Sequence, residues 1–205
     1  MSKQIILIGG APTTGKSTLA KALSNHFDIP WISSDQIREI MKATVDPEKY
    51  PSLFTQEIDV DTFYNNFTMQ QIVEMEKQQA KEIWPGVKAF IKNNFVWRKG
   101  FIVEGVGILP YLIDRDFKDD QKIKSLFLVD NDREKIRDIC FNRGLWGAPA
   151  DYPDSIKEKE VEWVLLFDKE IREEAAKYNY PIIEVGKNDE DVKKALEILT
   201  KNSHS

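Results

Sequence analysis

Five short apolar runs stand out along the chain, and longer segments with more polar residues separate them. The runs are rich in β-branched and aromatic residues, which is typical of strands buried on both faces of a parallel sheet. Segments that predict helices follow four of them. The runs span residues 5–8, 29–32, 101–105, 123–129 and 181–185. The pattern predicts an α/β fold, in which ligands bind beyond the carboxyl ends of the strands.

The segment 44–94 departs from this alternation. Asp46-Pro47 and Tyr50-Pro51 mark loops. A long helix is predicted after them, with a bend at Pro85-Gly86, from apolar residues at Ile72, Met75, Ala80, Ile83, Val87 and Phe90. Because a bare crossover between strands needs fewer residues, we interpret 44–94 as a mainly helical insert on the substrate side of the site. A purely structural pair of helices is the alternative.

Length and composition narrow the class of protein. A chain of 205 residues fits a single domain, 1–205. It has 29 Lys and Arg against 34 Asp and Glu, and this net charge of −5 argues against nucleic acid as a partner. The single cysteine, Cys140, cannot form an internal disulfide, so we expect a reducing compartment and a core position for this thiol. Because the first apolar run is too short for a signal peptide and no run approaches membrane length, we expect a cytoplasmic protein without a membrane segment.

The first apolar run leads into Gly10-Ala11-Pro12-Thr13-Thr14-Gly15-Lys16-Ser17-Thr18, which contains the phosphate-binding pattern Gly-x-x-x-x-Gly-Lys-Ser/Thr. The predicted strand before the pattern and the predicted helix after it supply the required context. Glycines let backbone N–H groups point at a phosphate, and the helix adds its positive dipole end. Lys16 is then placed to reach the β- and γ-phosphates of a nucleotide, and the Ser17 hydroxyl is placed to bind Mg²⁺.

Two charged residues follow the second run, where the next helix is predicted to begin. Asp35 is a candidate N-cap of that helix, since aspartate is a preferred capping residue. It also lies just past the carboxyl end of a strand, where α/β sheets bind ligands. Arg38 is one helical turn later on the same face. The pair is suited to hold a hydroxyl and an anionic group of a substrate, and Asp35 is our candidate to orient or deprotonate the acceptor.

The third run ends in a carboxylate and a glycine, Glu104-Gly105. A second acidic residue at this point of a phosphate-loop protein holds Mg²⁺ or its water shell. Binding of a substrate hydroxyl by Glu104 is the alternative. Gly105 allows the backbone to approach a ligand closely.

Three arginines lie on the helix predicted after the fourth run, before a Gly-rich break at 144–149. We interpret 143–155 as a lid over the phosphates. Arg137 and Arg143 are predicted to neutralise the transferring phosphoryl group and to contact the nucleotide. Arg133 is predicted to lie on a solvated face. An ordinary charged helix face is the alternative for Arg137 and Arg143 as well.

With these segments in order, the chain resembles the P-loop small-molecule kinases, in particular the 2-phosphoglycerate-kinase-like group. The resemblance implies a three-layer α/β/α fold with a five-stranded parallel sheet in the order 2-3-1-4-5. It also implies ATP and Mg²⁺, a mobile lid around Arg143, and an acceptor held near Asp35, Arg38 and Glu104. It rests on the segments 9–18, 33–39, 102–106 with Pro110 after it, and 126–133.

The sequence thus predicts an ATP-dependent kinase that phosphorylates a hydroxyl of a small-molecule acceptor, and the resemblance suggests one like 2-phosphoglycerate. Gly186-Lys187-Asn188-Asp189 is not the guanine-binding signature, so GTP has no support. Two alternatives stay open. The spacing of Asp35 and Arg38 also resembles polynucleotide 5′-kinases. An ATP-hydrolysing molecular switch is the other, although no switch motif follows Glu104.

Overall fold

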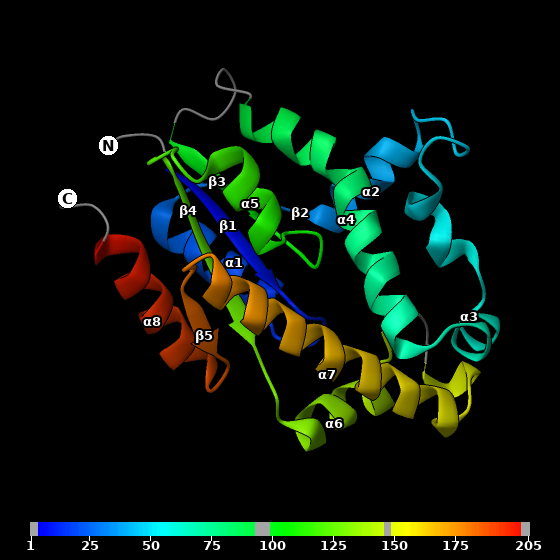
Figure 1. Ribbon diagram of the computed structural model, residues 1–205. Coiled ribbons are helices and arrows are strands. Elements are labelled where there is room, and N and C mark those ends of the chain that lie inside the picture. Colours follow the sequence, from blue (N-terminus) through cyan, green and yellow to red (C-terminus); the bar gives the residue numbers. More distant parts are fainter. Residues whose placement is uncertain (1–3, 93–98, 146–148, 202–205) are drawn as a thin grey trace.

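Five parallel strands form one sheet in the order β2-β3-β1-β4-β5 in the computed structural model, which describes residues 4–92, 99–145 and 149–201. The strand order and the parallel pairing confirm the prediction (Figure 1). The strands are β1 (Gln4–Gly10), β2 (Trp31–Ser33), β3 (Gly100–Glu104), β4 (Ile123–Val129) and β5 (Ile182–Glu184).

Helices cover both faces of the sheet, which explains why its central strands are apolar on both sides (Figure 1). The helices are α1 (Lys16–Phe27), α2 (Ser34–Lys42), α3 (Val60–Asn66), α4 (Met69–Lys92), α5 (Pro110–Phe117), α6 (Arg133–Arg143), α7 (Asp154–Lys177) and α8 (Asn188–Lys201). Two short 3₁₀ helices, η1 (Pro51–Glu57) and η2 (Pro149–Asp151), complete the described elements. No helix within the described ranges is long and apolar enough to span a membrane.

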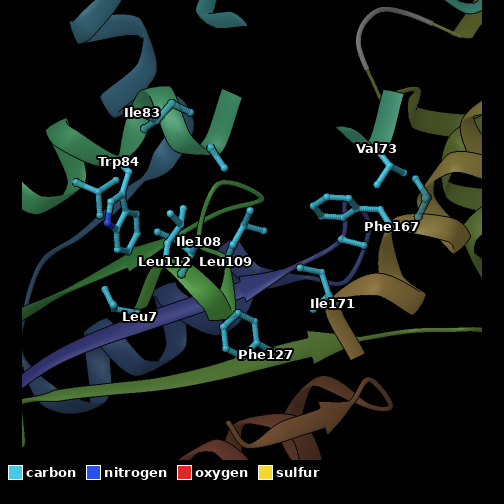
Figure 2. Packing of buried hydrophobic residues seen from close by; sticks show 14 of the residues in the cluster. Leu7, Val73, Ile83, Trp84, Ile108, Leu109, Leu112, Phe127, Phe167 and Ile171 are labelled. Carbon is cyan, nitrogen blue, oxygen red and sulfur yellow. The ribbon is translucent and has the colours of Figure 1, made fainter. Parts of the chain in front are cut away.

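Alternate residues of β1 point into two separate cores. Ile6 and Ile8 pack with residues of α1 and α8, whereas Leu7 belongs to the larger cluster on the other face. Figure 2 shows this larger cluster, in which Phe127 of β4 and Phe167 of α7 also take part. Burial of these side chains on both faces supplies the main stabilisation of the central strands.

The segment predicted as an insert is mainly helical, with η1, α3 and α4. Helix α4 is 24 residues long and continues through Pro85 without ending there. It packs against α2 and α7, and Gly86 is one point of contact with α2. A side chain at Gly86 would lie 2.6 Å from Met41 Sδ and 3.0 Å from Ile37 Cγ2. Helix α4 is thereby held against the helix that carries Asp35.

The carboxyl ends of three neighbouring strands meet at one edge of the sheet. Glu104 of β3 pairs in register with Ile8 of β1 and with Ser33 of β2. Gly10 at the end of β1 pairs with Leu128 of β4. This arrangement brings the phosphate-binding pattern, the start of α2 and Glu104 to the same edge.

Candidate active site

The loop between β1 and α1 is wound tightly. Thr13 and Gly15 have positive φ angles of 70° and 81°, and Gly15 is the N-cap of α1. A side chain at Gly10 would lie 2.3 Å from the Leu128 carbonyl oxygen, so only glycine fits there. The Thr14 hydroxyl closes the turn by donating to the Ala11 carbonyl oxygen at 2.8 Å. The loop thus delivers the first turn of α1, with its unpaired N–H groups, to the sheet edge, as anion binding requires.

Lys16 lies in the first turn of α1 and is 8% exposed. Its Nζ donates a hydrogen bond to the Ala11 carbonyl oxygen at 2.7 Å. Burial lowers the pKa of Lys16 to about 8, although the charges of Glu104 and Asp35 act in the opposite direction. The Thr13 hydroxyl oxygen of the same loop is buried without a hydrogen-bond partner among the described residues. A phosphate would supply both a counter-charge for Lys16 and an acceptor for Thr13.

Ser17 and Glu104 form a pair of oxygen groups beside Lys16. The Ser17 hydroxyl donates to Glu104 Oε1 at 2.9 Å, and Glu104 is 2% exposed. Burial raises the pKa of Glu104, while Lys16 and the hydrogen bond from Ser17 counteract that effect. Hydroxyl and carboxylate oxygens suit Mg²⁺, which takes the rest of its shell from water and nucleotide phosphates. The described residues form no cluster of three His, Cys, Asp or Glu side chains that would hold a metal alone.

Asp35 is not the N-cap of α2, so the capping interpretation is wrong. Ser33 is the cap: its hydroxyl oxygen accepts from the Gln36 backbone N–H at 3.1 Å, and Gln36 Oε1 accepts from the Ser33 N–H at 2.9 Å. This reciprocal capping box places the N-cap two residues before Asp35, which lies inside the first turn of the helix. The Asp35 carboxylate instead accepts from Arg38 Nη1 at 3.1 Å, as the spacing predicts. It remains 60% exposed and available to a ligand.

Arg38 is held in place by several oxygens. Besides Asp35, its Nη1 donates to Gln79 Oε1 of α4, and its Nε donates to Glu39 Oε1, each at 3.1 Å. Its side chain is only 7% exposed. Helix α4 therefore contacts the site directly through Gln79.

A single cavity of about 850 Å³ contains most of the predicted site residues. It brings together the loop, the start of α2, the end of β3 and the end of α6. The predicted residues that line it are Pro12, Thr13, Gly15, Lys16, Ser17, Thr18, Asp35, Arg38, Glu104 and Arg143. Gly10, Ala11 and Thr14 belong to the same loop but do not line the cavity. An elongated ligand placed on the loop would therefore reach Asp35 without leaving the cavity.

Arg137 is not brought to this cavity. Its Nε donates to Glu158 Oε1 of α7 at 2.6 Å, and its guanidinium lies 4.0 Å from the centre of the Phe141 ring. Arg143 is six residues later, a rotation of roughly 240° around an α-helix, so the two side chains cannot share a face. Arg133 is also paired outside the cavity, with Glu162 at 2.6 Å. Within the proposed lid, residues 146–148 lie outside the described residues, and Leu145 lines the cavity.

The cavity also contains residues that the sequence analysis missed. Glu76 reaches it from α4, and Asp138 and Asn142 reach it from α6. Two aromatic residues, Trp31 and Trp163, also line the cavity. Glu76 had a detectable signal, because Glu76 and Gln79 interrupt the apolar face that Ile72 and Ile83 define at helical spacing.

Comparison with known proteins gives one family match and several structural ones. The family described as AAA domain matches residues 5–84, which include the phosphate-binding loop, α2 and most of α4. No curated protein sequence matches the chain.

Solved kinase structures align over nearly the whole chain. A gluconokinase from Sinorhizobium meliloti 1021 has 16% identity and a TM-score of 0.57, over 97% of this chain and 92% of its own. A shikimate kinase from Acinetobacter baumannii in complex with shikimate has 14% identity and a TM-score of 0.56, over 100% and 97%. A shikimate kinase from Aquifex aeolicus has 17% identity and a TM-score of 0.51, over 98% of both chains. The chain therefore has the P-loop kinase fold, as its phosphate-binding motif and strand order indicate.

Proposed function

We propose that the protein is an ATP-dependent phosphotransferase that phosphorylates a hydroxyl of a small-molecule acceptor. The observation that carries the proposal is the shared cavity, which joins Lys16 and Ser17 of the phosphate-binding loop to Asp35 of α2. One end can hold a triphosphate and the other presents a carboxylate to an acceptor. Transfer between two ligands held in one cavity is catalysed mainly by positioning and by neutralising charge.

The nucleotide end is built around Lys16. Lys16 and the N-terminus of α1 would hold the β- and γ-phosphates, and Arg143 would neutralise charge on the transferring group. Ser17 would bind Mg²⁺ directly and Glu104 would hold its outer shell. When bound, Mg²⁺ supplies further neutralisation of the phosphate oxygens.

At the acceptor end, Asp35 is the proposed base. The acceptor hydroxyl would give its proton to the Asp35 carboxylate, while the hydroxyl oxygen bonds to the γ-phosphorus. The bond from that phosphorus to the bridging oxygen breaks, and ADP leaves. Arg38 fixes the orientation of the Asp35 carboxylate through its 3.1 Å contact. Glu104 is the alternative base, because it lines the same cavity.

The test is ATP turnover with and without a panel of small hydroxy compounds, including 2-phosphoglycerate. A kinase shows turnover that an acceptor stimulates, together with a phosphorylated product. A molecular switch would hydrolyse ATP regardless of acceptor and would respond to a protein partner. A polynucleotide kinase would respond only to oligonucleotide 5′ ends. Lys16→Ala serves as the inactive control, since it removes the side chain that would bind the β- and γ-phosphates.

A further inference from the structure

Carboxylates outnumber cations at the acceptor end of the cavity. We use this name for the wall formed by Trp31, Asp35, Arg38, Glu76 and Trp163, all of which line the cavity. Two of these side chains are carboxylates and one is a cation. Lys16 and Arg143 are the other cations of the cavity, and the proposed function assigns both to the phosphates.

Arg38 does not offset these carboxylates for an incoming ligand. It already contacts the carboxylates of Asp35 and Glu39 and the Gln79 amide oxygen, and its side chain is almost completely buried. An anionic acceptor would have to compete with two carboxylates for this guanidinium. Because like charges at close range repel strongly in a partly buried site, a carboxylate or phosphate on the acceptor is disfavoured here.

Glu76 is the group that lacks a partner. Its side chain makes no hydrogen bond or ion pair with any other residue in the described part of the chain, although Asp35 and Arg38 are near enough to affect it electrostatically. Burial and, to a smaller extent, the charge of Asp35 raise the pKa of Glu76 to about 7, while the charge of Arg38 acts in the opposite direction. Glu76 is partly exposed, and a carboxylate with few waters and no partner is unfavourable. A cation placed beside it would relieve that cost and restore its ionised form.

The two tryptophans supply the rest of the wall. Trp163 donates its Nε1–H to the Tyr64 hydroxyl at 2.5 Å, so the polar group of its ring is already satisfied. Trp31 is 37% exposed, at the edge of the sheet. Both rings line the same cavity as Glu76, and aromatic faces and carboxylates are groups with which proteins bind ammonium ions.

We propose that the acceptor is a hydroxy compound that carries a protonated amine, with the ammonium bound by Glu76 and the hydroxyl directed to Asp35. This inference rests on the proposed function, because it specifies the acceptor of the same site. It places the ammonium at the α4 side of the cavity, beside the Glu76 carboxylate. The reaction is the transfer already described, and the amine takes no part in bond making.

The experiment compares acceptors that differ mainly in charge. One set is 2-amino-1,3-propanediol, glycerol and glycerate, and a second set is glucosamine, glucose and glucuronate. We expect phosphorylation of at least one amine with a kcat/KM about tenfold or more above that of its neutral and anionic counterparts, as expected for a charge-assisted contact. If a neutral or anionic counterpart is phosphorylated with an equal or higher kcat/KM, this inference is overturned and the proposed function stays intact. Binding of ATP without phosphorylation of any member contradicts both.

Glu76→Gln tests the residue itself, because it keeps the shape of the side chain and removes the charge. We expect the KM of the amine to rise about tenfold, while the KM of its neutral counterpart does not rise with it. Glu74→Gln is the matched control on the same helix, since Glu74 is 59% exposed and does not line the cavity. If Glu76→Gln and Glu74→Gln give the same KM for the amine, Glu76 does not bind it and the proposal is wrong.

Discussion

Ser17 and Glu104 are 87 positions apart in the sequence, and the Ser17 hydroxyl donates a hydrogen bond of 2.9 Å to Glu104 Oε1. The bond joins the first turn of α1 to the end of β3 across the edge of the sheet. It holds two oxygen groups side by side next to Lys16. We propose this pair as the protein's contribution to magnesium binding.

Replacement of Glu104 tests that assignment. Glu104→Gln keeps the side-chain shape and an oxygen that can accept from Ser17, but it removes the charge. We expect kcat to fall by about tenfold or more and the Mg²⁺ concentration for half-maximal activity to rise, since an amide is a weaker partner for the cation and its waters. Thermal stability without ligands should not fall, because the lost carboxylate was buried. An unchanged magnesium dependence would move the role of Glu104 to the acceptor.

Arg143 and Arg137 form a matched pair of variants on one helix. Arg143→Ala should lower kcat by about a hundredfold or more and weaken ATP binding much less, because phosphoryl charge develops mainly in the transition state. Arg137→Ala should leave kcat close to the wild-type value, since its guanidinium is occupied by Glu158 and Phe141. Steady-state kinetics and ATP titrations on both variants make the comparison. If kcat falls by a similar factor in both variants, the effect comes from α6 as a whole and not from Arg143 in particular.

Asp35→Asn separates the base from a structural role. Because Ser33 caps α2, the variant loses only the ion pair with Arg38, which has one exposed partner, so stability should change by less than about 1 kcal/mol. Phosphorylation of the acceptor should fall by about a hundredfold or more, since an amide cannot accept the proton. ATP affinity should hardly change. Thermal melting, ATP binding and kcat are measured on one preparation of the variant. Full activity would show that Asp35 is not the base and would leave Glu104 as the candidate.

Glu160 of α7 gives a prediction about stability and pH. Its carboxylate is fully buried and accepts from the Tyr152 hydroxyl at 3.1 Å. Burial raises its pKa to about 7. A raised carboxyl pKa means that the neutral acid is favoured in the fold, so its stabilisation is present below about pH 4.5, the ordinary value, and is lost as the pH rises through 7.

The measurement is the free energy of unfolding of wild type and Glu160→Gln at pH 5 and pH 8. Gln does not titrate, so we expect the wild type to lose stability relative to the variant by on the order of 1 kcal/mol or more between the two pH values. Glu173→Gln, an exposed position of the same helix, is the control and should show no such shift. A constant difference between wild type and Glu160→Gln would show that Glu160 does not titrate in this range.

The strands were predictable because their environment is uniform. A central parallel strand buried on both faces needs apolar residues at every position, and the sequence shows such runs for β1, β3 and β4. The short helix α5 was not predicted, since its 8 residues leave little room for a periodic pattern. The phosphate-binding loop was predictable from the local sequence pattern alone, because its glycines and its lysine all lie within one stretch of nine residues.

The acceptor side was harder to predict, because it depends on contacts between distant segments. The capping error was avoidable: Ser33 followed by Gln36 is a capping-box pattern, and it places the start of α2 before Asp35. The separation of Arg137 from Arg143 also follows from helical geometry once α6 is accepted as one helix. The presence of Glu76 in the same cavity as Asp35 follows from neither pattern, since it requires the packing of α4 against α2.

Gly86 sets how closely these two helices approach, and through them the width of the acceptor end. It does not line the cavity, yet a methyl group at this position would meet Met41 at 2.6 Å and would force a new Met41 rotamer or a wider helix spacing. Asp35 belongs to α2 and Glu76 to α4, the two helices that meet at this contact. Substitutions at this remote contact therefore offer a route to admit larger acceptors while every group that touches the acceptor stays the same.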